Sequence, residues 1–275
     1  MTFSTRRSSW LPFDDPVRDP LSTLFCFPFA GGGASAYRNW IGQFSPEIRV
    51  CPVQLPGRES RFAERPFTDM AVLADNAAEE LVPHIQSPFI LFGHSMGAVL
   101  AFEVARCLRT RGAPEPALLV VASRLAPQLP IRDNILFNLP DSVLVEKLRR
   151  LGGSPKSILD DPEMMAALLP CIRADFQVVE TYTYQPAEPL SCPILALAGS
   201  EDPDVGSAEL DPWGEQTTGE FWRLILPGDH FVILSSPTEV IQTVRERARK
   251  ILAVAKLKPP DQHSVDQAAT AAEAL

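Results

Sequence analysis

The pentapeptide Gly93-His94-Ser95-Met96-Gly97 constrains the fold of this chain more than any other feature of its sequence. Four apolar residues, 89–92, precede it, and a helical pattern of apolar residues begins at Met96. A strand that ends in G-x-S-x-G and continues into a helix makes a sharp, strained turn that raises the serine hydroxyl above a sheet. Side chains at positions 93 and 97 would collide with the neighbouring strand or helix, so both positions require glycine. The pattern predicts Ser95 as a nucleophile.

Short apolar runs alternate with helical patterns on both sides of this turn. Strands are expected over residues 23–29, 49–55, 89–92, 118–122, 194–198 and 221–226. Helices are expected over residues 69–86, 96–111 and 240–254. Strands that alternate with helices imply a parallel sheet covered by helices on both faces. Together with the strand–turn–helix unit around Ser95, this alternation predicts the α/β-hydrolase fold.

The alternation fails between residues 127 and 189, which hold several prolines and two expected helices, 141–151 and 161–184. Inserted between two sheet strands, such a segment is expected to form a helical lid over the open edge of the sheet. An ordinary helical excursion that packs as core is the alternative. The predicted organisation is a hydrolase core over 1–126 and 190–255, a lid over 127–189, and a polar, disordered tail over 256–275.

Composition narrows the possible partners and locations. The 275 residues carry a formal net charge of −9, from 25 basic and 34 acidic side chains. A chain this acidic has no global attraction to nucleic acid or anionic lipid, so we expect neither as a partner. Its five cysteines are odd in number and form no C-x-x-C pair. Neither a secretory signal nor a membrane span is visible in the sequence. These features favour a cytoplasmic protein, which we expect to be a monomer without a cofactor.

A serine hydroxyl needs a base, and a histidine base needs a carboxylate that orients it. Of the four histidines, only His230 lies in a glycine-bearing loop after the last expected strand, where this fold places its base. The loop after the strand 194–198 supplies Asp202 as the carboxylate, with Asp204 or Glu201 in reserve. The chain order Ser, Asp, His is that of α/β hydrolases. A metal site at Asp202 and Asp204 is disfavoured because no histidine or cysteine clusters with them.

The developing oxyanion needs two hydrogen-bond donors. The helix that begins at Met96 directs free N–H groups toward the serine, and the loop after the first strand reads Pro28-Phe29-Ala30-Gly31-Gly32-Gly33. We therefore expect the backbone N–H groups of Met96 and Ala30 to form the oxyanion hole. The glycine run could pass for a phosphate-binding loop, but it lacks the Lys-Ser/Thr pair of a P-loop.

Several motifs occur together and in order. They are Pro28-Phe29-Ala30-Gly31-Gly32, Gln54-Leu55-Pro56-Gly57-Arg58, Gly93 to Ala98, Gly199 with Asp202, and Gly228-Asp229-His230-Phe231. In this combination the chain, from about residue 24 to 253, resembles the type II (external) thioesterases of polyketide and nonribosomal peptide synthesis. The segment Arg173 to Phe176, followed by Tyr182 and Tyr184, is similar to the lid of that family.

The resemblance implies a stand-alone editing enzyme. Such an enzyme would hydrolyse stalled or wrongly primed acyl groups from the phosphopantetheine arm of an acyl or peptidyl carrier protein. Carrier proteins are generally acidic, as is this chain, so docking would need a local positive surface. Arg58, Arg61 and Arg65 are candidates for it, and a solvated loop with surface ion pairs is the alternative. Phe176 is a candidate substrate contact in the lid, and a place in the helix core is the alternative.

Three other functions are compatible with the Ser95 motif. An acyltransferase is disfavoured because malonyl transferases carry a Gly-Gln-Gly segment near the N-terminus, which this chain lacks, and need no acid after a late strand. Another hydrolase on the same scaffold, such as an esterase or peptidase, would be separated by comparing ester and thioester turnover. A non-catalytic binding protein would usually have lost a member of the triad, whereas all three positions are filled here.

Overall fold

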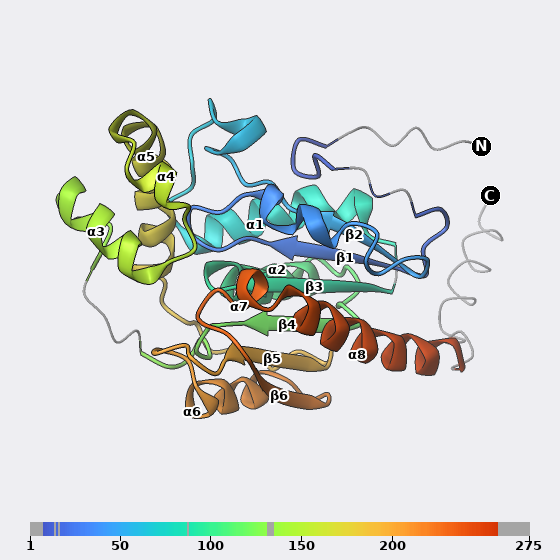
Figure 1. The fold of residues 1–275 in the computed structure, drawn as a ribbon. Helices are drawn as coiled ribbons and strands as arrows, with labels where there is room; N and C mark the ends of the chain where they lie inside the picture. The colour runs from blue at the N-terminus through green and yellow to red at the C-terminus, as the bar shows by residue number, and fades with distance from the viewer. Residues whose placement is uncertain (1–7, 14, 16, 87, 131–134, 258–275) are drawn as a thin grey trace.

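The computed structural model describes residues 8–13, 15, 17–86, 88–130 and 135–257. In this part of the chain a parallel sheet of six strands runs in the order β2-β1-β3-β4-β5-β6 (Figure 1). The strands are β1 Ser22–Phe27, β2 Ile48–Pro52, β3 Phe89–His94, β4 Leu118–Ala122, β5 Ile194–Gly199 and β6 Phe221–Leu226. The predicted α/β-hydrolase sheet is confirmed. The first strand ends earlier than expected, at Phe27, because Pro28 has no N–H to continue the ladder.

Helices cover both faces of this sheet. The α-helices are α1 Met70–Leu81, α2 Met96–Thr110, α3 Asp141–Leu151, α4 Lys156–Leu159, α5 Pro162–Glu180, α6 Ser207–Leu210, α7 Val232–Ser235 and α8 Pro237–Leu257. The 3-10 helices are η1 Ala34–Trp40, η2 Glu59–Arg61, η3 Val82–His84 and η4 Asp211–Gln216. The Asp69 side chain accepts a hydrogen bond from Val72 N–H and caps α1.

Successive side chains of each strand point to opposite faces of the sheet, and this divides the core into two layers. On β1, Phe25 and Phe27 pack with α1 and α2 on one face of the sheet. Leu24 and Cys26 point to the opposite face and pack with η1 and α8. Since side chains of a strand alternate between faces, one apolar strand supplies both layers, and this explains why the strands read as unbroken apolar runs.

Between β4 and β5 the described chain forms α3, α4 and α5, which build a small apolar cluster of their own at one end of the sheet (Figure 1). Helix α5 ends at Glu180 and not near residue 184 as expected. The Tyr182 hydroxyl donates to Glu103 on α2 and the Tyr184 hydroxyl to Gln216 on η4, so both tyrosines are fixed to the core in an extended segment.

The expected tail, 256–275, lies outside the described residues except for 256 and 257, which end α8. No helix in the described part of the chain is long and apolar enough to span a membrane.

Candidate active site

Ser95 lies in a strained turn between β3 and α2. Its backbone has φ 54° and ψ −114°, a conformation that costs free energy and is found at functional sites. A Cβ at Gly93 would lie 1.9 Å from the carbonyl oxygen of Gly97, and one at Gly97 would lie 2.2 Å from that of Phe27. Strand β3, helix α2 and strand β1 therefore approach so closely that only glycine fits on either side of the serine.

Ser95, His230 and Asp202 form a continuous chain of hydrogen-bond contacts. The distance from Ser95 Oγ to His230 Nε2 is 3.2 Å, and that from His230 Nδ1 to Asp202 Oδ2 is 2.9 Å. The three residues follow β3, β6 and β5, whose carboxyl ends meet at one edge of the parallel sheet. The structure thus brings together the three residues that the sequence predicts for nucleophile, base and carboxylate.

The loops of Asp202 and His230 hold each other in place. Glu201 N–H donates to the carbonyl of Gly228 at 2.8 Å, and a Cβ at Gly199 would lie 2.2 Å from the carbonyl oxygen of Asp229. This close approach fixes the carboxylate and the imidazole relative to each other.

The Asp202 side chain is fully buried yet well supplied with donors. Besides His230, the backbone N–H groups of Asp204 and Val205 donate to its Oδ1 at 3.0 and 3.2 Å. Burial alone would raise the pKa of this carboxyl, but the hydrogen bond and charge of His230 and the two backbone donors outweigh it and lower the pKa. The carboxylate stays ionised beside the imidazole, as an orienting group must.

The other acidic candidates do not reach the imidazole. Asp204 and Glu201 are exposed, and no hydrogen bond joins either of them to His230 in the described structure. The Asp229 side chain accepts from the N–H of Phe231, so it points away from the ring despite its position beside it. Asp202 is therefore the carboxylate that the geometry selects.

His94 packs beneath the turn as a neutral side chain. It is fully buried, and its Nε2 lies 2.8 Å from the carbonyl oxygen of His230, so Nε2 carries the proton. Burial, and secondly the neighbouring His230, lower the pKa of His94 from 6.5 to about 3. His94 supports the loop of His230 from below, and Phe29 and Phe231 pack against its ring.

A cavity of about 280 Å³ opens beside Ser95 and His230. We call it the acyl cavity. Much of its wall is apolar and comes from the segment of α3 to α5 and from the loops around the sheet edge: Phe29, Leu125, Leu136, Leu148, Leu151, Phe176, Val179, Val205 and Phe231. Phe176, expected as a substrate contact, lies on this wall. The cavity can hold an apolar group next to the serine hydroxyl.

The two expected oxyanion donors flank the same space. Met96 is the first residue of α2, so its N–H has no acceptor within the helix, and Ala30 lines the acyl cavity. The residue after Ala30 is tied down, because Gly31 N–H donates to Asp175 Oδ2 at 2.7 Å. A side chain of α5 therefore fixes the loop that carries Ala30.

Asp175 is one half of a buried ion pair that the sequence did not reveal. Its carboxylate is bound by both terminal nitrogens of Arg58, at 2.6 and 2.8 Å, and Arg58 also donates to the carbonyl of Gly32 at 3.0 Å. Burial lowers the pKa of Arg58, but the charge and hydrogen bonds of Asp175 outweigh this and raise it. The pair connects α5 to Gly31 and Gly32 in the loop after β1, which we call the oxyanion loop because it carries the expected donor Ala30.

The expectation that Arg58 and Arg61 form a docking surface is corrected by their burial. Arg58 is committed to Asp175, and Arg61 binds Glu64 and the carbonyl of Gln54 while its guanidinium stacks on Trp10. Of the three arginines, only Arg65 is exposed. Two of the three arginines therefore make contacts inside the protein and do not form a positive surface.

The fold and these residues define the class of protein: an α/β hydrolase whose serine stands at the edge of a parallel sheet. The Thioesterase domain family matches residues 22–248, and the chain belongs to this family. No group of three histidine, cysteine, aspartate or glutamate residues that could hold a metal ion occurs within the residues described.

Relatives and solved structures agree with this assignment. The gramicidin S biosynthesis protein GrsT of Aneurinibacillus migulanus is 43% identical over 253 residues, which are 92% of this chain and 99% of that protein. The RedJ thioesterase from the prodiginine pathway of Streptomyces coelicolor has a TM-score of 0.78 at 38% identity, over 88% of this chain and 93% of that one. The type II thioesterase BorB from the borrelidin cluster has a TM-score of 0.78 at 37% identity, over 84% and 94%. The resemblance to type II thioesterases is thereby confirmed.

Proposed function

We propose that this protein is an editing thioesterase that releases acyl groups from the phosphopantetheine arm of acyl or peptidyl carrier proteins. The observation that carries the proposal is the hydrogen-bonded chain Ser95–His230–Asp202, whose serine and histidine line a largely apolar cavity. Membership of the thioesterase family supports a thioester as the bond that is cleaved. Relatives such as GrsT and BorB, named for antibiotic pathways, support a carrier-bound substrate.

In the first half of the reaction, His230 Nε2 takes the Ser95 proton as Oγ attacks the thioester carbonyl carbon. The negative charge that develops on the carbonyl oxygen is stabilised by the N–H groups of Met96 and Ala30, and one such donor contributes about 3–4 kcal/mol to the transition state. The C–S bond then breaks, the pantetheine thiol leaves with the proton from His230, and the acyl group remains on Ser95. Asp202 stabilises the imidazolium that forms in between.

In the second half, His230 takes a proton from a water molecule that attacks the acyl-serine carbonyl. The same two N–H groups stabilise the second oxyanion, and the C–O bond to Ser95 breaks as His230 returns the proton to Oγ. The products are the free acid and the regenerated serine. The apolar wall that includes Leu148 and Phe176 favours acyl groups of aliphatic character.

Ser95→Ala tests the nucleophile. We expect it to abolish hydrolysis of a hexanoyl thioester, on N-acetylcysteamine and on a carrier protein, while the far-UV circular dichroism and melting temperature match the wild type. Retention of most activity in the folded variant would exclude Ser95 as the nucleophile. Assays with the matching ester and with an added acceptor thiol separate a thioesterase from an esterase and from an acyltransferase, because only a thioesterase prefers the thioester and delivers the acyl group to water.

A further inference from the structure

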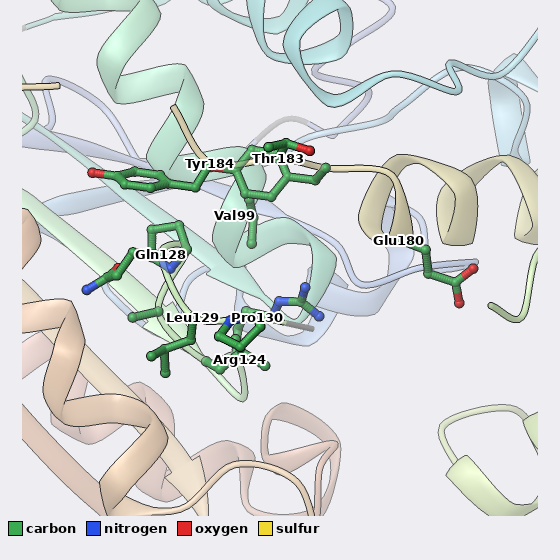
Figure 2. Close-up of a pocket in the computed structure, with 12 residues that line it drawn as sticks. Val99, Arg124, Gln128, Leu129, Pro130, Glu180, Thr183 and Tyr184 are labelled. Carbon is green, nitrogen blue, oxygen red and sulfur yellow. The ribbon is translucent and has the colours of Figure 1, made fainter. Parts of the chain in front are cut away.

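A second cavity, of about 360 Å³, adjoins the acyl cavity. The two cavities share Arg124, Leu125 and Glu180 as lining residues, so these three form the boundary between them. In Figure 2, Thr183 and Tyr184 lie along one side of the second cavity, and Arg124 lies along the other. A substrate whose thioester is held at Ser95 has two ends, and the two cavities offer a compartment for each.

Arg124 is the cation at this boundary, and it lacks a counterion in the described part of the chain. Its Nε is buried and has no hydrogen-bond partner there. Glu180, the acidic residue that lines both cavities, uses its carboxylate to accept from the backbone N–H groups of Leu136 and Phe137. That carboxylate points away from the guanidinium (Figure 2).

None of the described residues offsets the charge of Arg124. Burial lowers the pKa of Arg124 to about 10, and the nearby Tyr182 offsets this only in part. Arg124 is half-buried, and a cation that is partly taken out of water without an opposite charge destabilises the fold. Gln128 also lines the second cavity, and its buried amide oxygen Oε1 likewise has no partner among the described residues. Unpartnered polar groups in residues that line a cavity are expected where a ligand supplies what is missing.

We propose that Arg124 binds an oxyanion of the substrate while the thioester is held at Ser95. This inference rests on the proposed thioesterase function and adds a recognition site to it. A guanidinium binds phosphate and carboxylate groups through paired N–H donors, so either group satisfies the chemistry. The oxyanion can come from the phosphate of the pantetheine arm or from a carboxylate on the acyl group. The apolar wall of the acyl cavity and the polar atoms of the second cavity favour the arm.

The test compares substrates that differ by one charged group. Hexanoyl thioesters of N-acetylcysteamine, pantetheine and 4′-phosphopantetheine lengthen the arm and add the phosphate only in the last. A succinyl thioester of N-acetylcysteamine places a carboxylate on the acyl group. Each is assayed for kcat and KM with the wild type, with Arg124→Met and with Arg150→Met. Arg150 is 71% exposed and lines neither cavity, so its variant matches the change in net charge without touching the boundary.

We expect Arg124→Met to lower kcat/KM for the oxyanion-bearing substrate about 10- to 100-fold, mainly through KM, because a hydrogen bond to a charged group is lost. The kcat/KM of the neutral thioesters should change much less in Arg124→Met than that of the oxyanion-bearing substrate, and Arg150→Met should change none of them. The melting temperature should not fall, since removal of a half-buried charge that no described residue pairs with costs little stability. Arg124→Gln provides a second uncharged variant if the methionine variant does not fold.

The outcomes separate the alternatives. A loss confined to the phosphopantetheine thioester assigns the site to the arm, and one confined to the succinyl thioester assigns it to the acyl group. Equal losses on all substrates, or none, would overturn the oxyanion site while leaving the thioesterase function in place. If the wild type hydrolyses no thioester, the proposed function itself fails.

Discussion

Asp175→Asn removes one negative charge from inside the protein while leaving the size of the side chain almost unchanged. Asp175 is 1% exposed and accepts three hydrogen bonds, one from Gly31 N–H and two from Arg58. An asparagine has one oxygen, and its NH2 group would face another donor, so at least one hydrogen bond is lost. The guanidinium of Arg58 then stays buried without its counterion.

The structure sets the size of the effect. Removing one partner of a buried ion pair typically costs about 3–5 kcal/mol, because the other charge stays buried and uncompensated. For a protein of this size each kcal/mol lowers the melting temperature by about 2–4 °C, so a fall of about 6–20 °C is expected. Because Asp175 also holds Gly31, next to the proposed oxyanion donor Ala30, kcat should fall even at temperatures where the variant is folded.

Thermal and urea denaturation measure the stability, and thioester hydrolysis well below the melting temperature measures kcat. Asp141→Asn is the matched control on the same group of helices. Asp141 pairs with Arg173, but its side chain is 72% exposed, so the loss should stay within about 1 kcal/mol. A double variant, Arg58→Met with Asp175→Leu, should lose less stability than the sum of the two single variants.

Two results would refute this reasoning. The first is an Asp175→Asn variant as stable as Asp141→Asn, which would mean that the buried pair contributes no more than an exposed one. The second is strict additivity of the Arg58 and Asp175 substitutions, which would show that the two side chains do not interact energetically.

Two further predictions concern the turn around Ser95. Gly97→Ala should destabilise the protein by about 3 kcal/mol or more, because its Cβ would lie 2.2 Å from the Phe27 carbonyl oxygen. Urea denaturation measures this loss. Gly206→Ala is the control, because a Cβ at that position meets only ordinary contacts. Buried His94 should make the protein sensitive to acid. Its pKa is 6.5 in a model peptide and about 3 in the fold, so the unfolded chain takes up the proton first, and stability should fall by up to about 4–5 kcal/mol as pH drops from 6.5 to 3. His94→Gln should flatten that slope, and an unchanged slope would exclude His94 as its origin.

The sequence revealed those parts of the site that have a local signature. Ser95 stands in a fixed pattern between a strand and a helix, and both of its glycines are required by contacts with neighbouring backbone. His230 and Asp202 follow recognisable strands, and parallel strands bring their carboxyl ends to one edge. All strand ends were predicted to within three residues, and the first strand stops two residues early because Pro28 has no N–H for the ladder.

The sequence could not reveal which charges would be buried. Arg58 and Asp175 are 117 residues apart, and only the folded chain places one against the other. Three arginines close together in a polar segment suggest a surface, and nothing local distinguishes a buried guanidinium from a solvated one. The similarity of residues 173–176 to the lid of type II thioesterases was the one signal that could have drawn attention to Asp175. Arg124 had no such signal, because its significance comes from the absence of a neighbour in the described structure.

The Arg58–Asp175 pair also limits how the entrance can open. Helix α5 cannot move away from the sheet as a rigid body without separating Asp175 from Gly31 and Arg58, and so releasing the oxyanion loop. A widening of the acyl cavity that keeps these contacts can come from the end of α3, where Leu148 and Leu151 line the cavity. Gly152 and Gly153, at the end of α3, both have φ 79° and provide backbone freedom there. Access for the substrate and preorganisation for the reaction are thus assigned to different helices.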